Sequence, residues 1–371
     1  MILKSIELAN YRNYKHLDIS FDEGTNILYG DNAQGKTNIL EAAYISGTSK
    51  SHRGTKDRDI IQFDEDEAHI KTVVEKQEKN YQIDIHLKKN KTKGIAINKV
   101  PIKKSSELFG ILNIVLFSPE DLNIIKNGPS ERRRFIDAEL CQLDKIYLSD
   151  LTNYNKVLNQ RNKLLKDIYF NTSLKETLPI WDEQLIMYGR KVIARRNQFI
   201  RDLNEIVYDI HKNISGGKEE LFLQYEPNIE DIFFEDELIR AKEKDLKLAQ
   251  TSVGPHRDDM KLSVGNIDVR KFGSQGQQRS CALSLKLSEI KLVEKTIKDK
   301  PILLLDDVLS ELDQNRQNFL LQTINDTQTI ITCTGLDDFV KNRFHLNRVY
   351  EVKNGTVSLH SEKMEEANDS E

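Results

Sequence analysis

The feature that most constrains the fold is a glycine-rich loop behind a short apolar run. Residues 30–37 read G-x-x-x-x-G-K-T, which is the pattern of a P-loop. The apolar run 26–29 predicts a strand before the loop, and apolar residues at helical spacing over 39–44 predict a helix after it. This order of strand, loop and helix is the phosphate-binding unit of an α/β fold.

The chemistry of the loop points to a nucleoside triphosphate. Its glycines let the backbone curl so that N–H groups point at phosphate. We expect Lys36 to reach the β- and γ-phosphates as a catalytic group, and the Thr37 hydroxyl to bind Mg²⁺. The cofactors expected are therefore ATP and Mg²⁺. The residues predicted to touch the nucleotide are Gly30, Asp31, Asn32, Ala33, Gln34, Gly35, Lys36, Thr37 and Asn38. The alternative is a glycine-rich turn with an unrelated lysine.

Length, charge and cysteine content narrow the class of protein. A chain of 371 residues suggests two domains. The formal net charge of −4 means that any contact with nucleic acid must come from local basic patches. The three cysteines form no C-x-x-C pair, which favours a reducing cytosol and hence a cytoplasmic protein. No apolar run approaches the ~20 residues that a membrane-spanning helix needs.

The pattern of apolar residues predicts strands and long helices in separate parts of the chain. Alternation predicts strands at 2–8 and 17–21, and a small antiparallel sheet from 68–75, 80–87 and 93–97. The apolar run 111–117 predicts a strand buried on both faces. Helical spacing continues from 130 to about 169, and Pro179 begins a second long helix, so we expect an antiparallel helical pair. The segments 260–264 and 267–272 predict two more short strands.

Three segments could contact nucleic acid. Tyr11, Arg12 and Tyr14 could stack on a base, or form an ordinary polar turn. The segments 50–58 and 190–196 are rich in Lys and Arg, and each is either a phosphate-binding patch or a solvated surface.

A second apolar run carries two carboxylates at its end. Residues 301–305 predict a buried strand, and Asp306 and Asp307 follow it. An aspartate that emerges at the carboxyl edge of a parallel sheet can bind Mg²⁺, as in a Walker B strand. We therefore expect Asp306 to hold Mg²⁺ and Asp307 to orient the attacking water.

These motifs together resemble a known family. A P-loop and a Walker B strand separated by a helical insertion resemble the ABC-type ATPase heads of the SMC and Rad50 kind. Residues 274–278 look like the signature motif of that class, and 310–313 look like its D-loop. Further segments along nearly the whole chain are similar to the bacterial RecF family: 8–14, 30–37, 117–122, 128–133, 254–259 and 304–307.

The resemblance implies an α/β fold, a P-loop ABC-type ATPase head with a helical-hairpin arm. The head would comprise 1–125 and 258–360, the arm 126–257, and 361–371 would be a disordered tail. Two heads would dimerise on ATP, because the signature residues Ser274, Gly276 and Gln277 would serve the nucleotide of a second subunit. The resemblance also implies a weak ATPase whose turnover releases the dimer from DNA. It implies binding to gapped DNA and junctions, and cooperation with RecR and RecO in loading RecA.

Three positions depart from the ABC pattern. Asp307 stands where most of these ATPases have Glu, Thr334 stands near the place of the switch histidine, and no Gln marks the Q-loop, for which 118–120 is the best candidate. Two alternatives remain at this point. A transporter ATPase would share the motifs but act on a membrane subunit. An SMC or Rad50-type tether would need hundreds of coiled-coil residues.

Overall fold

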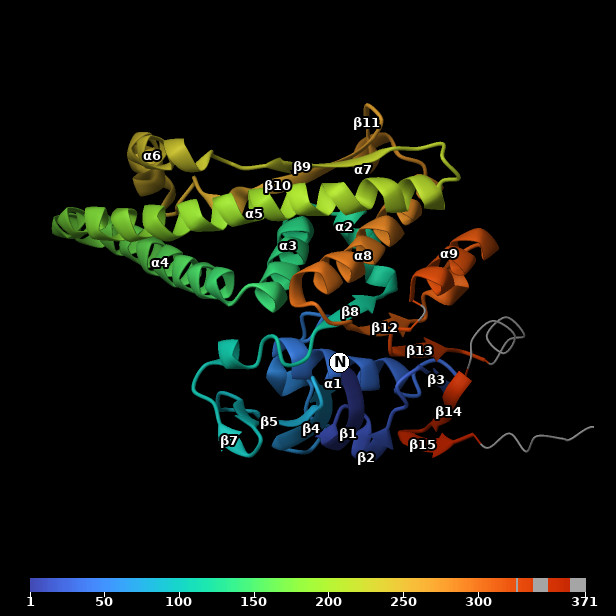
Figure 1. The fold of residues 1–371 in the computed structure, drawn as a ribbon. Coiled ribbons are helices and arrows are strands. Elements are labelled where there is room, and N and C mark those ends of the chain that lie inside the picture. Colours follow the sequence, from blue (N-terminus) through green and yellow to red (C-terminus); the bar gives the residue numbers. More distant parts are fainter. Residues whose placement is uncertain (325, 336–345, 361–371) are drawn as a thin grey trace, which may run out of the picture. The chain divides into compact units, whose positions relative to one another are not determined.

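The computed structural model describes residues 1–324, 326–335 and 346–360 (Figure 1). The predicted disordered tail, 361–371, lies outside these residues. The chain forms two compact units, one from Met1–Pro119 with Asp299–Glu371 and one from Glu120–Lys298. In the following text these are called the sheet unit and the helical unit.

The sheet unit carries all the strands predicted in the first part of the chain. Its elements are β1 (Ile2–Tyr11), β2 (Tyr14–Ser20), β3 (Thr25–Tyr29), α1 (Lys36–Thr48), β4 (Glu67–Lys76), β5 (Lys79–Lys88), β6 (Gly94–Ile97), β7 (Val100–Pro101), β8 (Ile114–Phe117), β12 (Ile302–Asp306), α9 (Gln314–Ile324), β13 (Thr329–Cys333), β14 (Leu346–Lys353) and β15 (Thr356–Leu359).

Two sheets share the core of this unit. The first is antiparallel, in the order β2-β1-β4-β5-β6-β7, and it joins the predicted small sheet to the N-terminal strands. The second has the order β15-β14-β3-β13-β12-β8, and all its neighbours are parallel except the edge pair β14 and β15. Helix α1 contacts strands of both sheets. Its apolar residues Ile39, Leu40, Ala42 and Ala43 belong to a core that draws side chains from both sheets, which fixes the position of the loop before α1.

The helical unit contains the predicted antiparallel pair. Its elements are α2 (Leu122–Lys126), α3 (Pro129–Leu143), α4 (Lys145–Phe170), α5 (Leu178–Ile214), β9 (Leu221–Glu226), α6 (Phe234–Leu248), β10 (Asp259–Val264), β11 (Ile267–Asp268), α7 (Val269–Phe272) and α8 (Gln275–Ile297). The two long helices run antiparallel: Asp144, the residue before α4, accepts a hydrogen bond from Arg195 at the middle of α5 at 2.8 Å. Near the other end of the pair, Arg161 bonds Asp182 at 2.6 Å.

Two local predictions for this unit were wrong. The helical pattern before residue 170 is broken, because Asp144 accepts hydrogen bonds from the N–H groups of Ile146 and Tyr147 and so caps a new helix. The second predicted strand at 267–272 ends at Asp268, which caps the short helix α7 in the same way.

The division of the chain also differs from the predicted one at two places, since residues 120–125, which were assigned to the head, belong to the helical unit. Residues 258–298 were assigned to the head, but they pack within the helical unit. Strand β10 pairs with β9 in an antiparallel ladder, and α8 packs along α5. Sequence motifs placed this segment with the P-loop, whereas its packing partners are the helices.

Candidate nucleotide-binding site

The parallel register of the second sheet brings the predicted site residues to one edge. Tyr29, the last residue of β3, pairs with Cys333 of β13, and Thr332 pairs with Asp306 of β12. The P-loop leaves β3 at this edge and Asp307 leaves β12 there. The carboxyl edge of a parallel sheet is where such folds bind ligands.

The backbone of the P-loop needs its two glycines. Gly30 and Gly35 have φ values of 150° and 117°, which side chains rarely tolerate. A Cβ at Gly30 would lie 2.2 Å from the Val352 carbonyl oxygen, and a Cβ at Gly35 would lie 2.6 Å from the Tyr14 hydroxyl oxygen. Between them, Asp31, Asn32 and Ala33 are exposed. The loop is therefore tightly packed at both ends and open at its crown.

Helix α1 begins directly after the loop, and no side chain accepts a hydrogen bond from the N–H groups at its N-terminus. Its first turn has no acidic residue. The first N–H groups of a helix attract anions when no side chain satisfies them. Asn38, in this first turn, is half-buried and donates to the Asn13 side chain at 2.8 Å.

Lys36 is buried within the loop that it follows. Its ammonium donates to the carbonyl oxygens of Gly30 and Asp31, the latter at 2.8 Å. Burial lowers the pKa of Lys36 from its ordinary value, while the charge of Asp307, more weakly that of Asp306, opposes the shift. The lysine is thus a desolvated donor whose charge is influenced by both carboxylates of the Walker B strand.

Asp306 is the centre of a hydroxyl network. Its Oδ1 accepts from Thr37 Oγ1 at 2.8 Å and from Thr332 Oγ1 at 2.8 Å. Thr332 in turn accepts from the N–H of Asp307 at 3.0 Å. Asp307 has a φ of 54°, a left-handed conformation that is uncommon outside glycine and recurs at functional sites. The network fixes the direction in which the two carboxylates leave the strand.

Three residues of this site were missed by the sequence analysis. Thr332 has no motif, and only the register of β13 against β12 reveals it. Asn13 donates to the Gln34 carbonyl oxygen at 2.9 Å, and the Asn354 N–H donates to the Gln34 side chain at 2.6 Å. The β1–β2 turn and the β14–β15 turn therefore hold the P-loop from two sides.

The proposed base-stacking role of the β1–β2 turn is wrong. Tyr11 and Tyr14 are fully buried, so neither ring can stack on a base, and the turn is not an ordinary polar one either. Arg12 forms two hydrogen bonds to the Glu41 carboxylate in α1, at 2.8 and 2.9 Å. Burial works against that carboxylate, but hydrogen bonds from Arg12 and Ser51 leave the pKa of Glu41 below its ordinary value. The turn is a structural clamp on the helix of the P-loop.

The oxygen donors at this site fit a magnesium ion that takes some of its ligands from the protein and others from a nucleotide. Within the described residues, no group of three or more His, Cys, Asp and Glu side chains could hold a metal. Thr37 and Asp306 present oxygen donors, and Mg²⁺ typically binds one or two protein oxygens together with phosphates and waters. The remaining ligands would have to come from phosphate and solvent.

The other positions of the ABC pattern lie at recognisable places. Ser118 is buried directly after β8, whose Phe117 pairs with Leu305 next to Asp306. Thr334 is exposed directly after β13. Both therefore follow strands of the parallel sheet, although nothing in their contacts assigns them a role.

The signature residues form the start of α8 in the helical unit. Ser274 caps the helix, and its hydroxyl oxygen accepts from the N–H of Gln277 at 3.2 Å. Ser274, Gln275 and Gly276 are exposed. The Ser274 hydroxyl keeps its proton for another acceptor.

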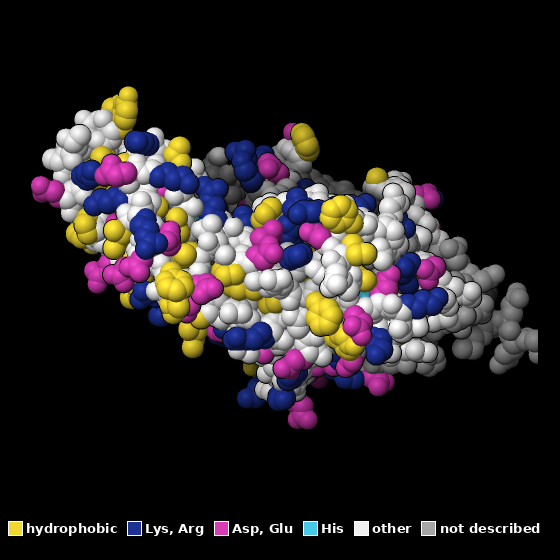
Figure 2. Space-filling view, turned by 90° about the horizontal axis from the view of Figure 1, so that it is seen from above, with side chains coloured by type: hydrophobic (Ala, Val, Ile, Leu, Met, Phe, Trp, Pro, Cys, Tyr) yellow, Lys and Arg dark blue, Asp and Glu magenta, His cyan; other side chains and the backbone are white. Residues whose placement is uncertain are grey.

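The segment 190–196 is not a free basic patch. Each of its four basic side chains is bonded to a carboxylate of the helical unit. The pairs are Arg190 with Glu235, Lys191 with Asp150, Arg195 with Asp144, and Arg196 with both Asp137 and Asp258. Arg196 is buried and carries its charge inside this cluster. On the face shown in Figure 2, basic and acidic side chains are intermixed rather than gathered by sign.

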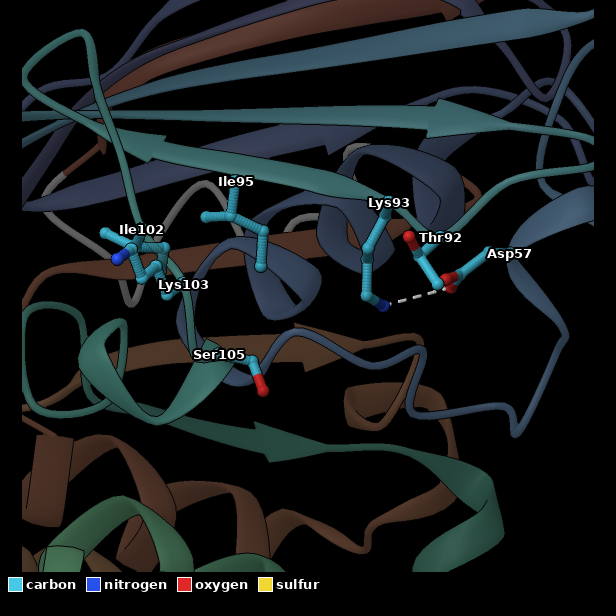
Figure 3. A pocket seen from close by; sticks show the side chains of 7 residues that line it. All are labelled: Asp57, Thr92, Lys93, Ile95, Ile102, Lys103 and Ser105. Carbon is cyan, nitrogen blue, oxygen red and sulfur yellow. Dashed lines mark hydrogen bonds and ion pairs between the residues drawn. The ribbon is translucent and has the colours of Figure 1, made fainter.

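The segment 50–58 keeps more of its charge exposed. The side chains of Lys50, Arg53 and Lys56 are exposed and form no ion pair with another described residue. A pocket of about 300 Å³ lies beside this segment (Figure 3). The residues that line it are Asp57, Thr92, Lys93, Ile95, Ile102, Lys103 and Ser105. Lys93 reaches back to Asp57 at 3.1 Å, whereas the Lys103 side chain is exposed.

Comparison with known proteins identifies the family. The model of the RecF/RecN/SMC N-terminal domain matches residues 2–358. The DNA replication and repair protein RecF of Agathobacter rectalis is 69% identical, over 97% of this chain and 99% of that protein. The RecF of Lachnospira eligens is 61% identical, over 96% and 99%. The chain belongs to the RecF family of DNA replication and repair proteins.

The RecF fold is also found in a solved structure. The recombination mediator protein RecF with ATP, of the RecFOR pathway, matches with a TM-score of 0.91 and 37% identity, over 97% of each chain. RecF membership confirms the predicted ABC-type α/β fold and does not favour the transporter or tether alternatives. Among the described helices, none is long and apolar enough to cross a membrane.

Proposed function

We propose that this chain binds ATP with Mg²⁺ in the P-loop, hydrolyses it slowly, and acts as an ATP-dependent DNA-repair protein. The observation that carries the proposal is the contact between Thr37 of the P-loop and Asp306 of the Walker B strand, at 2.8 Å. A glycine-rich turn without a ligand has no need for a buried lysine and a hydroxyl–carboxylate pair at the same sheet edge. The ATP-bound RecF relative supports the same assignment.

The roles of the residues follow from their positions. The backbone N–H groups of the loop and of the α1 N-terminus hold phosphate, and Lys36 adds a charge that its desolvation makes more effective. Thr37 and Asp306 would hold Mg²⁺, which would supply Lewis-acid stabilisation of the phosphates. Asp307, oriented by its N–H bond to Thr332, accepts a proton from the attacking water. Its side chain is one methylene shorter than the usual Glu, which fits a slow turnover.

The active unit in this proposal is a homodimer. Ser274, Gly276 and Gln277 belong to the helical unit, whereas the P-loop belongs to the sheet unit. Exposed residues at the N-terminus of α8 are suited to receive a phosphate that another subunit carries. Two subunits related by a two-fold axis would each complete the other's site. Hydrolysis would then release the dimer from DNA.

The DNA and protein partners are proposed from the family. RecF is described as a recombination mediator in the RecFOR pathway. We infer binding to gapped DNA and to junctions of duplex and single strand, with RecR and RecO as partners in loading RecA. A protein that acts on bacterial DNA would work in the cytoplasm, and Cys141, Cys281 and Cys333, which form no disulfide among the described residues, fit a reducing compartment.

We propose that the DNA surface lies on the exposed basic side chains of the sheet unit. Lys50, Arg53 and Lys56 form it, and Lys103 at the pocket of Figure 3 extends it. These side chains present unneutralised charge to phosphate, which the segment 190–196 does not.

The test is binding to gapped, single-stranded and duplex DNA, with and without ATP and Mg²⁺, in a gel-shift series that contains no lipid. We expect ATP to raise the affinity for gapped DNA, and Lys36→Ala protein to lose both this rise and nucleotide binding. Nucleotide affinity is measured separately by titration with a fluorescent ATP analogue. Equal affinity of Lys36→Ala and wild-type protein for the analogue would refute the assignment of the P-loop.

A further inference from the structure

The first turn of α8 is held by a reciprocal pair of hydrogen bonds. The N–H of Gln277 donates to Ser274 Oγ at 3.2 Å, and the N–H of Ser274 donates to Gln277 Oε1 at 2.9 Å. This capping box fixes the orientation of the Gln277 amide, because only its oxygen can accept from the Ser274 N–H. The amide nitrogen therefore points away from Ser274.

That nitrogen has a charged acceptor outside the helix. Gln277 Nε2 donates to Glu219 Oε1 at 2.9 Å. Glu219 lies in the short segment between α5 and β9, where its own N–H donates to Ser215 Oγ at 3.2 Å. A hydrogen bond to a carboxylate is stronger than one between neutral groups, so this bond fixes the Gln277 side chain more firmly than the capping box does alone.

The same carboxylate reaches the long helix of the arm. Glu219 Oε2 lies 3.3 Å from Nε2 of His211, which is fully buried in the last turn of α5. The other ring nitrogen of His211 lies 2.9 Å from Ser284 Oγ of α8. The start of α8 is thus bound to α5 through a continuous set of polar contacts. In the proposed dimer, Ser274 and Gln277 would bind the phosphate of the nucleotide that the partner subunit carries.

We propose that Glu219 is a positioning residue for the signature motif. It fixes Gln277, and through the capping box it holds the backbone and hydroxyl of Ser274 ready for the phosphate of the partner subunit. This inference rests on the proposed ATP-dependent dimer. Because Glu219 contacts both His211 of α5 and Gln277 of α8, a shift of α5 would also change the geometry of the signature motif.

The charge of Glu219 is not what the motif needs. A carboxylate near the N-terminus of α8 offsets the positive end of the helix and would weaken an incoming phosphate. The geometry points instead to the reach of the side chain, that is, its length: it must be long enough to accept a hydrogen bond from Gln277. Charge and reach are separable by substitution.

Two variants make that separation. Glu219→Asp keeps the charge but is one methylene too short, and Glu219→Gln keeps the length and an oxygen that can accept from Gln277. We expect Glu219→Asp to weaken dimerisation with a non-hydrolysable ATP analogue and Mg²⁺ by about tenfold, since the shorter side chain no longer accepts the hydrogen bond from Gln277. Glu219→Gln should stay within about threefold of wild type. Sedimentation equilibrium gives the dimer dissociation constants.

Glu220 provides the matched control. It is adjacent in the chain and accepts from the Tyr208 hydroxyl at 2.6 Å, without a contact to Gln277. Glu220→Asp and Glu220→Gln should dimerise like wild type. Amide hydrogen exchange of residues 275–278 in the nucleotide-free monomer supplies a second readout, which Glu219→Asp should accelerate and Glu219→Gln should not. Binding of the fluorescent analogue to the monomer should be unchanged in all four variants.

The outcomes separate this inference from the proposed function. If wild-type protein dimerises and Glu219→Asp dimerises equally well, Glu219 does not position the motif, even if hydrogen exchange changes. If Glu219→Gln is as defective as Glu219→Asp, reach alone does not explain the role of Glu219 and the inference fails. If wild-type protein does not dimerise with the analogue, the proposed function fails and this inference fails with it.

Discussion

Thr37 and Thr332 both donate a hydroxyl to the same oxygen, Oδ1 of Asp306, each at 2.8 Å. Thr37 belongs to the P-loop helix and Thr332 to the neighbouring strand of the parallel sheet. One carboxylate oxygen therefore joins the predicted phosphate loop to the sheet edge from which Asp307 emerges.

Thr332→Val should show whether Thr332 orients the carboxylates of the site or only stabilises its own strand. Valine has nearly the same shape, but it leaves the N–H of Asp307 without its acceptor, which costs about 1–3 kcal/mol of stability. We expect ATP turnover to fall further than that loss explains, because the direction of Asp307 is no longer fixed. Turnover is measured by phosphate release, and stability by urea unfolding.

Thr329→Val is the control for this change. Thr329 lies on the same strand, is buried, and donates to the Thr327 carbonyl oxygen at 3.0 Å, away from the site. It should lose similar stability with turnover preserved. Equal loss of turnover in both variants would show that Thr332 acts through the strand alone.

Asp307→Asn should retain ATP binding and dimerisation but lose turnover by about 10²–10⁴-fold, the usual contribution of a general base. Asparagine tolerates the left-handed backbone found at this position, so the change removes the base without adding strain. Phosphate release and analogue binding are measured on the same preparation. Hydrolysis at the wild-type rate would mean that another group accepts the proton.

The pH dependence of stability should reveal a buried acid pair in the helical unit. Glu139 of α3 and Glu289 of α8 are both buried, and each has one carboxyl oxygen with no hydrogen-bond partner among the described residues. Burial raises the pKa of both, most strongly that of Glu289, and Lys286, which bonds Glu289 at 2.5 Å, opposes the shift only in part. The charge of Asp121 raises both pKa values further.

The direction in which stability changes with pH follows from the protons that the folded and unfolded chains bind. Above the ordinary value of 4.5, the unfolded chain releases a proton that the folded protein keeps. Stability is therefore highest below that pH and falls as pH rises toward the raised pKa, by up to about 1.4 kcal/mol per pH unit for one proton. Glu289→Gln should flatten this fall in urea unfolding at several pH values. Glu294→Gln, which removes a partner of Lys291 elsewhere on α8, should not. Identical profiles for both variants would argue against a raised pKa of Glu289 in the folded protein.

What the sequence could predict depended on whether a feature is local. The P-loop and the Walker B strand are contiguous patterns, so the elements around them were predicted correctly: strand β3, helix α1 with Lys36 and Thr37, and strand β12 with Asp306. Thr332 was missed because its place depends on the register between two strands that are joined through a helix. A contiguous pattern carries no such information.

The ion pairs of the basic segment 190–196 could not be predicted for a related reason. Its charges are close in sequence, but their partners come from other elements: Asp137 lies on α3, and Asp258 lies in the segment before β10. A run of basic residues indicates an exposed basic surface only where no carboxylate from another element pairs with it. Arg196 is the extreme case, because neighbouring charges raise its pKa well above the ordinary value although burial opposes them.

The DNA surface can be tested through its salt dependence. Affinity for gapped DNA should fall steeply with salt, because each contact with phosphate releases a counterion. Arg53→Gln should reduce the slope of log affinity against log salt by about one unit. Arg190→Gln is the matched control, since Arg190 is already bonded to Glu235 and to the Asp231 carbonyl oxygen. A slope that responds to Arg190 and not to Arg53 would move the DNA surface to the helical unit.

Ser274→Arg tests whether the active unit is a dimer. The P-loop of the same subunit is untouched, so nucleotide affinity of the monomer should stay near that of wild type. A bulky cation at the exposed start of α8 should instead clash with the partner subunit and block dimerisation on ATP. The substitution also removes a helix cap, which costs about 1 kcal/mol, so Ser274→Asn, which can cap, serves as the control for stability.

Mixing Ser274→Arg with Lys36→Ala protein sharpens this test. In a mixed dimer, one composite site joins the defective P-loop to the defective signature motif, and the other joins two intact motifs. Partial recovery of hydrolysis is expected if one intact site is sufficient and if the single arginine then faces only the empty site. Analytical ultracentrifugation of Ser274→Arg with a non-hydrolysable ATP analogue gives the decisive measurement. A normal dimer there would place Ser274 away from the interface, and the two-site sandwich would have to be abandoned.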